Sequence, residues 1–448
     1  MLDPATASDT LVALIDSARR AGADAADAVY VGDRSTAVGV RLGALEDVSR
    51  AEGQEIGLRL FVGQQSAAVA SSDMARESLT ALVDRALAMA RAAPADQYAG
   101  LAPSELLLQG PRADLDLDDG GDPDPAALRL RAEAAEDAAR SIAGITNSNG
   151  AGASASASTF AIATSHGFAG ATRATGYSCS ASVVAGSGSG MQRDYGWHSA
   201  RHLADLEDPQ AIGRRAGERA AARLNPVRVK PGPMTILFDP RVATTLLGHF
   251  VGAISGGAIT RQASFLLDAL GSQVFAKGVT IHDDPFRPRG LRSRGFDGEG
   301  LPVAGTDLVA DGVLATWLAD SAAARQLGIA PTGHAVRGVS GAPGAGPSNL
   351  FLQPGPRSRE AMIAGVKHGI LVTELIGQGV NSLTGDYSRG AAGFLIVDGE
   401  IGPAVSEITI ASNLKTMFAS LEPASDLHIR RGIDSPTLLV PEMMVASA

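Results

Sequence analysis

The sequence predicts an α+β protein with an N-terminal α/β module, a central antiparallel β region with flanking helices, and a C-terminal mixed domain rich in strands. Three observations support this prediction. Helical and strand-like patterns alternate at the N-terminus, residues 153–164 alternate with period two, and Asp-Gly pairs stand between apolar runs in the C-terminal half. At 448 residues, the chain is long enough for two or three domains.

Changes in composition divide the chain into four segments. Residues 1–97 are predicted to form the N-terminal α/β domain, and residues 98–124, rich in Asp, Pro and Gly, an acidic linker. Residues 125–227 contain the central helices and antiparallel strands. A group of prolines around residue 231 marks the clearest boundary, after which residues 228–448 form the C-terminal β-rich domain.

The N-terminal domain is predicted to begin with a helix. Ser8 can cap this helix, which extends to about Arg20, because a serine oxygen accepts hydrogen bonds from free backbone amides of the first turn. Strand-like runs follow at residues 27–31, 36–41, 55–62 and 67–71. A second helix is predicted to start at Ser72 or Asp73 and to end near Ala92, shortly before a proline.

The central segment is predicted to start with a helix at Asp124-Pro125, since aspartate is a good cap and proline fits the first helical position. Alternating runs at residues 153–164, 168–184 and 195–203 indicate three or four antiparallel strands with one polar face. A helix over residues 209–224 closes this segment.

The C-terminal domain repeats these signals. A strand at residues 235–238 precedes a helix that begins at Asp239-Pro240 and reaches about residue 254. Asp311-Gly312 and Asp398-Gly399 each stand between apolar runs and predict two β-hairpins. Residues 338–347, rich in Gly and Pro, are predicted to form a loop.

Charge and composition argue against several classes of protein. The net charge is −10 and aromatic residues make up 4%, so binding to nucleic acid is not expected. The uncharged stretches 242–260 and 141–172 are too polar and glycine-rich to span a lipid bilayer. The N-terminus lacks a basic region followed by an apolar run, so we expect a cytoplasmic protein without a membrane partner.

Common catalytic motifs are missing from the sequence. It contains no phosphate-binding G-x-x-x-x-G-K-[ST] loop, no G-x-S-x-G elbow, and no histidine followed by glutamate. His198 and His202, four residues apart, could supply two metal ligands, but no third ligand stands nearby. Cys179 is the only cysteine; it lies in an alternating strand and is predicted to be a small buried apolar residue.

A long block in the C-terminal half resembles a known family. Residues 369–381 read GILVTELIGQGVN, and residues 384–394 read TGDYSRGAAGF. This block is similar to the signature of the PmbA (TldE) proteins of the TldD/PmbA family, which is also called the modulator of DNA gyrase family. Shorter pieces at residues 296–300 and 347–349 are similar too, and the resemblance covers nearly the whole chain.

The resemblance implies a subunit of a heterodimeric, cytoplasmic zinc metalloprotease that cuts small unfolded peptides. In TldD-type subunits a helix carries H-E-x-x-x-H, which binds zinc with help from a later cysteine. The corresponding residues in this chain are Gly248, His249 and Ala253, and glycine and alanine offer no lone pair to a metal. The resemblance therefore implies that this chain alone holds no cofactor, is not catalytic, and completes a peptide chamber over the zinc of a TldD-type partner.

Six residues of the signature block are the candidate contacts with peptide substrate or partner: Glu374, Gln378, Asn381, Asp386, Tyr387 and Arg389. The glycines among them permit close backbone approach. Arg389 can pair with a peptide carboxylate, or it can pair with Asp386 or Glu374 and only fix the loop. His249 is expected to be a core or interface histidine rather than a catalytic base.

Two other functions remain open from the sequence. The chain could be an independent hydrolase that uses His198 and His202 with an acidic residue, or a scaffold or binding protein without a protease partner. The isolated chain could also form a homodimer through the surface that a partner subunit would cover.

Overall fold

A curved antiparallel sheet of six strands forms the first half of the molecule. The computed structural model describes residues 1–447. The strands of this sheet are β1 (Ala25–Arg41), β2 (Ala44–Val62), β3 (Gln65–Ser71), β4 (Ile145–Thr164), β5 (Ala169–Ala185) and β6 (Gln192–Ala200). Their order is β3-β2-β1-β4-β5-β6. Because β1 pairs with β4 from Asp27 to Val40, the predicted N-terminal and central segments contribute to one sheet.

Four helices cover one face of this sheet: α1 (Pro4–Arg20), α2 (Arg76–Ala92), α3 (Pro125–Arg140) and α4 (Pro209–Ala222). The helices α1 and α2 share a core with Ala28 and Tyr30 of β1, and α3 and α4 share a core with Val40. These positions differ by even numbers along β1, so they lie on the same face of the strand. The opposite face carries Asp27 and Val29, which contact the C-terminal part.

The predicted starts of the first two helices are wrong. The first helix begins at Pro4 rather than after Ser8, because the side chain of Asp3 caps it by accepting hydrogen bonds from the first backbone amides. The second helix begins at Arg76, since the Asp73 carboxylate holds a turn before it by accepting from the Ala75 amide. The predicted Asp-Pro starts of α3 and α5 (Pro240–Ala253) are confirmed, and α4 begins at Pro209 as predicted.

Three predicted strands in the N-terminal segment are also too short. The runs at residues 27–31 and 36–41 belong to the single strand β1, and β2 begins at Ala44 rather than at residue 55. Residues 44–52 are exposed on both faces, so they show no apolar alternation although their backbones continue the pairing.

The acidic segment 98–124 is packed against the sheet. Buried and exposed residues alternate in it: Leu115 and Leu117 are buried, whereas Asp114 and Asp116 are exposed. The Leu117 carbonyl accepts a hydrogen bond of 2.9 Å from the backbone amide of Thr175 on β5. The segment therefore connects α2 to α3 while it lies along the strand surface.

The C-terminal part contains a second sheet that closes on itself. Its strands are β7 (Gly232–Phe238), β14 (His368–Ile376), β15 (Asp386–Val397), β16 (Glu400–Asn413), β17 (Glu422–Pro423) and β19 (Leu438–Ser447). Their order is β16-β15-β14-β7-β19-β17, and an additional pairing of β16 with β19 closes the ring.

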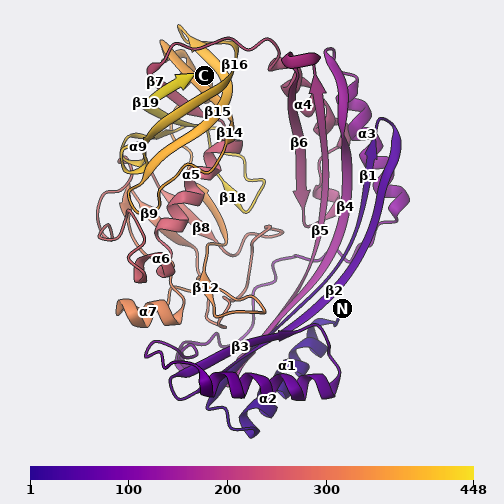
Figure 1. Ribbon diagram of the computed structural model, residues 1–448, viewed down its shortest axis with the longest axis vertical. Helices are drawn as coiled ribbons and strands as arrows, with labels where there is room; N and C mark the ends of the chain where they lie inside the picture. The colour runs from indigo at the N-terminus through magenta and orange to yellow at the C-terminus, as the bar shows by residue number, and fades with distance from the viewer. Residues whose placement is uncertain (448) are drawn as a thin grey trace.

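A smaller sheet shares the C-terminal core. It consists of β8 (Ile281–Asp284), β9 (Thr306–Ala310), β10 (Val313–Leu314), β13 (Asn349–Leu352) and β18 (Ile433–Asp434). Short helices complete this part: α5 (Pro240–Ala253), α6 (Gly256–Thr260), α7 (Ser321–Leu327), α8 (Arg359–Ala364) and α9 (Leu414–Ser420). Figure 1 shows the long strands of the first sheet curving along one side of this C-terminal part.

The two predicted Asp-Gly hairpins are confirmed. Asp311-Gly312 joins β9 to β10, and Asp398-Gly399 joins β15 to β16. All four residues have positive φ angles, which is the turn geometry that suits the twist of a hairpin. The predicted loop 338–347 is wrong at one point, because Gly344–Ala345 forms the short strand β12 beside β11 (Ala335–Val336). None of the helices within residues 1–447 combines the length and apolar character that a membrane crossing requires.

The contact between α3 and α4 depends on glycine. A methyl group at Gly213 would lie 2.0 Å from the carbonyl oxygen of Ala135, so the two helices would have to separate. We expect Gly213→Ala to lower the free energy of unfolding by about 1–3 kcal/mol, measured by urea denaturation. The matched control is Gly252→Ala in α5, where a methyl group meets no atom within 4 Å. Equal stability losses in both variants would contradict this account.

Candidate functional site

The helix α5 carries the positions at which the resemblance implies a zinc motif in TldD-type subunits. It starts after Asp239, whose carboxylate accepts a hydrogen bond of 3.2 Å from the Arg241 amide. One face of the helix, including Leu246 and Phe250, lies in the C-terminal core. Gly248 is exposed, and a methyl group there would meet no atom within 4 Å. This stretch of the helix surface is therefore open.

His249 lies beside this open surface and contacts β15. Its ring stands edge-on to the ring of Tyr387, with 6.2 Å between the ring centroids. Arg389 follows Tyr387 by two residues, so both side chains project from the same face of the strand. His249 Nε2, Tyr387 Oη and Arg389 Nε are buried and have no hydrogen-bond partner within residues 1–447. We call these three residues the His249 cluster.

The His249 cluster contains one formal charge. Burial, and to a smaller extent the Arg389 guanidinium, lowers the pKa of His249, so the imidazole is neutral at pH 7. Burial also raises the pKa of Tyr387, which keeps the phenol protonated. Arg389 is buried and forms no ion pair in the described part of the chain. An unpaired buried charge is costly, and no carboxylate of the described residues offsets this one.

The residues at this position do not fit a zinc ion. Zinc sites in proteins use at least three nitrogen, sulfur or oxygen ligands, whereas Gly248 and Ala253 leave His249 as the single donor. The guanidinium of Arg389 would also repel a divalent cation. Across residues 1–447, no three His, Cys, Asp or Glu side chains are grouped so that they could hold a metal.

Asn381 and Asp386 stabilise the loop that precedes β15. The Asn381 side chain accepts hydrogen bonds of 2.9 and 3.3 Å from the amides two and three residues later. Asp386 accepts from the Thr384 hydroxyl (2.6 Å) and the Asn413 amide (3.1 Å), and these bonds lower the pKa of Asp386. Gln378 is exposed in the same loop.

Glu374 takes part in a different set of contacts, between the two halves of the molecule. On β14, its carboxylate forms an ion pair with Arg223 at the end of α4 and lies 4.0 Å from Arg193 of β6. Arg223 also donates to Asp194 (3.2 Å), which accepts from Arg241 of α5 (2.7 Å). These contacts tie β6 and α4 to the C-terminal sheet.

Of the six predicted contact residues, the structure brings Tyr387 and Arg389 together, beside His249. Asp386 and Glu374 have the partners described above, and neither pairs with Arg389. The interpretation in which Arg389 only fixes the loop through one of these acids is therefore not what the structure shows.

The two histidines four residues apart contact different partners. His198 Nδ1 accepts a hydrogen bond of 3.1 Å from the Glu207 amide. His202 lies beyond the end of β6, and its Nε2 is 2.9 Å from the carbonyl oxygen of Asp116. No further His, Cys, Asp or Glu completes a metal site with them in the part of the chain that the structure describes.

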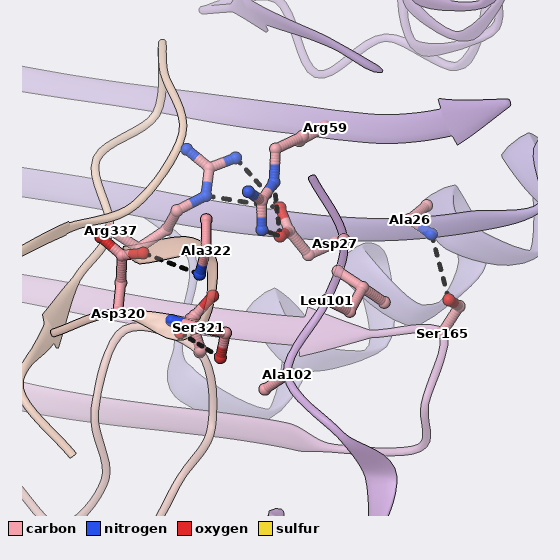
Figure 2. A network of polar contacts seen from close by, with 12 residues as sticks. Ala26, Asp27, Arg59, Leu101, Ala102, Ser165, Asp320, Ser321, Ala322 and Arg337 are labelled. Carbon is pink, nitrogen blue, oxygen red and sulfur yellow. Dashed lines mark hydrogen bonds and ion pairs between the residues drawn. The ribbon is translucent and has the colours of Figure 1, made fainter. Parts of the chain in front are cut away.

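A buried ion-pair network joins the two halves of the molecule (Figure 2). Asp27 of β1 accepts hydrogen bonds from Arg59 Nε (2.8 Å) on β2 and from Arg337 Nη2 (3.0 Å), which follows β11. This network was not predicted from the sequence. The sequence did contain one signal for it: Asp27 stands at the start of the apolar run 27–31. A carboxylate buried with such a run needs a positively charged or hydrogen-bonding partner.

Comparison with known proteins identifies relatives along the whole chain. Family models of the PmbA/TldA metallopeptidases match with domain 1 at residues 26–90, the central domain at 118–224 and the C-terminal domain at 231–447. Metalloprotease PmbA of Escherichia coli O157:H7 is 35% identical over 426 residues, which are 94% of this chain and 92% of that protein. The PmbA homolog of Haemophilus influenzae is 34% identical, over 96% and 94% of the two chains.

Solved structures with the same architecture include a candidate modulator of DNA gyrase from Bacteroides thetaiotaomicron. Its TM-score is 0.91 at 27% identity, and the match covers 98% of both chains. TldE from Thermococcus kodakarensis has a TM-score of 0.87 over 98% of this chain and 100% of that one. At 21% identity, this second likeness concerns the fold alone.

Proposed function

Since the chain belongs to the PmbA/TldD metallopeptidase family, we propose that it is a PmbA/TldE-like, non-catalytic subunit of a cytoplasmic zinc metalloprotease. A TldD-type partner carries the zinc, and this chain completes the chamber in which small unfolded peptides are cut. The observation that carries the proposal is the set of residue types at three positions of α5. Where a metal-binding helix needs two histidines and a glutamate, α5 has Gly248, His249 and Ala253, with Arg389 beside them.

The missing ligands explain why this chain needs a partner. Bound zinc lowers the pKa of a water molecule so that it can attack a peptide carbonyl near neutral pH. The His249 cluster has one imidazole and a positive charge, so its residues cannot supply that chemistry by themselves. Cleavage therefore takes place at the metal of the TldD-type subunit.

The contribution of this chain is to hold the peptide and to exclude water. Gly248 and Gly252 leave the exposed side of α5 without side chains, so an extended backbone can approach it closely. Arg389 can bind a carboxylate of the peptide, and such a charge-assisted bond is strong where the surroundings are buried.

Reconstitution tests the proposal. Zinc content and cleavage of unstructured peptides are measured for the chain alone, for a TldD-type subunit alone, and for their equimolar mixture. We expect no stoichiometric zinc and no cleavage with the chain alone, a heterodimer on mixing, and cleavage by that heterodimer. Stoichiometric zinc or cleavage with the chain alone would refute the proposal, as would the failure of the two chains to associate.

The variant Arg389→Gln tests the role of the His249 cluster in the same assay. We expect kcat/KM of the heterodimer to fall about tenfold or more, because one charge-assisted hydrogen bond to the peptide is lost. Heterodimer formation, followed by size-exclusion chromatography, should persist. The control is Arg129→Gln, since Arg129 forms a surface pair with Glu133 on α3. Unchanged kinetics in Arg389→Gln would show that the peptide does not contact this residue.

A further inference from the structure

A cavity of about 200 Å³ lies between the first sheet and the C-terminal part. Its walls come from β6, α4, the start of α5, the start of α8 and residues 428–435. Six arginines line it: Arg215, Arg219, Arg241, Arg359, Arg430 and Arg431. Asp239 and Asp434 are the two carboxylates in the lining. Although the chain has a net charge of −10, the side chains that line this cavity are mostly positively charged.

Most of these arginines have a carboxylate partner. The ion pairs are those of Arg215 and Arg430 with Glu207 (2.6 and 2.5 Å), Arg241 with Asp194 (2.7 Å) and Arg359 with Asp239 (3.1 Å). Two of these pairs, Arg430 with Glu207 and Arg241 with Asp194, connect the first half of the molecule to the C-terminal part. The four pairs account for four of the six guanidinium groups and for one of the two lining carboxylates.

Arg219 and Arg431 have no carboxylate within ion-pair distance in residues 1–447. Arg219 makes one long hydrogen bond, of 3.4 Å, to the carbonyl oxygen of Tyr195. The Arg431 guanidinium lies 4.9 Å from the ring centroid of Trp197 and donates a bond of 3.4 Å to the Arg241 carbonyl. Both side chains therefore retain unused N–H donors at the cavity.

Asp434, the remaining acid of the lining, is engaged elsewhere. Its carboxylate accepts hydrogen bonds from the backbone amides of Arg430 (3.1 Å) and Arg431 (3.0 Å). Burial lowers the pKa of both Arg219 and Arg431, as expected for charges without full compensation, but guanidinium groups stay protonated in proteins. The cavity thus contains two positive charges that no side chain of the described residues neutralises by direct contact.

We propose that this cavity binds the phosphate group of a small phosphorylated molecule. A phosphate monoester carries about two negative charges near pH 7, which matches the two uncompensated guanidinium groups. Its oxygens accept paired N–H bonds from the planar arginine fork. A peptide carboxylate has a single charge and would leave one guanidinium uncompensated, so phosphate is the better match. This site is separate from the His249 cluster and does not rest on the proposed protease function.

A neighbouring cavity has room for the rest of such a molecule. It measures about 370 Å³ and shares His198, Arg430 and Arg431 with the first cavity. Arg201 and Arg287 add positive charge to its lining. Because both cavities lie between the two halves of the molecule, a bound ligand would contact both halves and should raise the unfolding temperature.

Calorimetry and thermal unfolding at constant ionic strength test the proposal, with inorganic phosphate and AMP as probes and sodium chloride as the reference salt. We expect saturable binding of at least one of the two probes, with a rise in unfolding temperature that chloride does not produce. Arg219→Gln and Arg431→Gln should each weaken binding about tenfold or more, since each removes charge-assisted hydrogen bonds. If AMP binds more tightly than inorganic phosphate, the ligand is a phosphate ester. If the two probes bind equally, the site recognises the phosphate group alone, and free phosphate is the ligand.

The control Arg129→Gln, at a surface ion pair on α3, should bind as the unmodified chain does. If a glutamine variant fails to fold, Arg431→Lys replaces it, because lysine keeps the charge but loses the planar fork and should still weaken binding. The proposal is overturned if neither probe binds saturably at millimolar concentrations, or if both arginine variants bind as the unmodified chain does.

Discussion

Replacing Asp27 with alanine is expected to lower the free energy of unfolding by about 3–5 kcal/mol, because two buried guanidinium groups then lose their counter-charge. Asp27 is 2% exposed, and its partners Arg59 and Arg337 are 5% and 4% exposed (Figure 2). Burial on its own disfavours the charged carboxylate, but the two guanidinium groups outweigh it and lower the pKa of Asp27. The stabilisation is therefore present above the unfolded-state pKa and is lost as the pH falls through the folded-state pKa.

Urea denaturation followed by circular dichroism measures this effect. Since Arg337 comes from the C-terminal part, the Asp27→Ala variant should also loosen the junction, so that two spectroscopic probes no longer report coincident transitions. Glu133→Ala, which breaks the exposed pair with Arg129 on α3, is the control and should cost less than about 1 kcal/mol. A loss below about 1 kcal/mol for Asp27→Ala would mean that the guanidinium groups find other partners.

Local signals predicted those parts of the fold that depend on neighbouring residues. Asp124-Pro125 and Asp239-Pro240 start helices because the cap and the fixed proline act within one turn, and Asp398-Gly399 forms its hairpin for a similar reason. The pairing of β1 with β4 joins segments far apart in the sequence, so no local pattern could reveal that one sheet serves both. The exposed stretch 44–52 lacked the alternation from which strands are predicted.

In the candidate site, too, local sequence signals predicted some features, and contacts between distant segments determine the others. The signature block predicted Tyr387 and Arg389 as contact residues. It could not predict that Arg389 lacks a carboxylate partner, because Glu374 instead pairs with Arg223 at the end of α4. The arginine cavity was missed altogether, although Arg215 and Arg219 are four residues apart and therefore lie on one helix face. Such a row predicts a basic surface, but not the approach of residues 428–435 that turns it into a cavity.

Replacing Glu299 with glutamine is expected to remove a pH dependence of stability. Glu299 is 4% exposed, and burial raises the pKa of its carboxyl from the usual 4.5 to about 7. That value already includes a smaller upward contribution from the neighbouring Asp297 carboxylate. It also includes the opposing effect of hydrogen bonds from the amide (2.8 Å) and hydroxyl (2.7 Å) of Ser321. Ser321 lies at the start of α7, close to the Asp27 network (Figure 2).

The sign of the effect follows from proton binding. The folded state holds the Glu299 proton more tightly than the unfolded state does, so the free energy of unfolding falls as the pH rises from 4.5 to about 7. Glutamine cannot ionise but keeps an oxygen for Ser321, so the variant should match the unmodified chain near pH 4.5 and exceed its stability by about 3 kcal/mol near pH 8. Urea denaturation across this range measures the difference, with Glu133→Gln as the surface control. Parallel curves for Glu299→Gln and the unmodified chain would show that Glu299 is ionised in the folded state without cost.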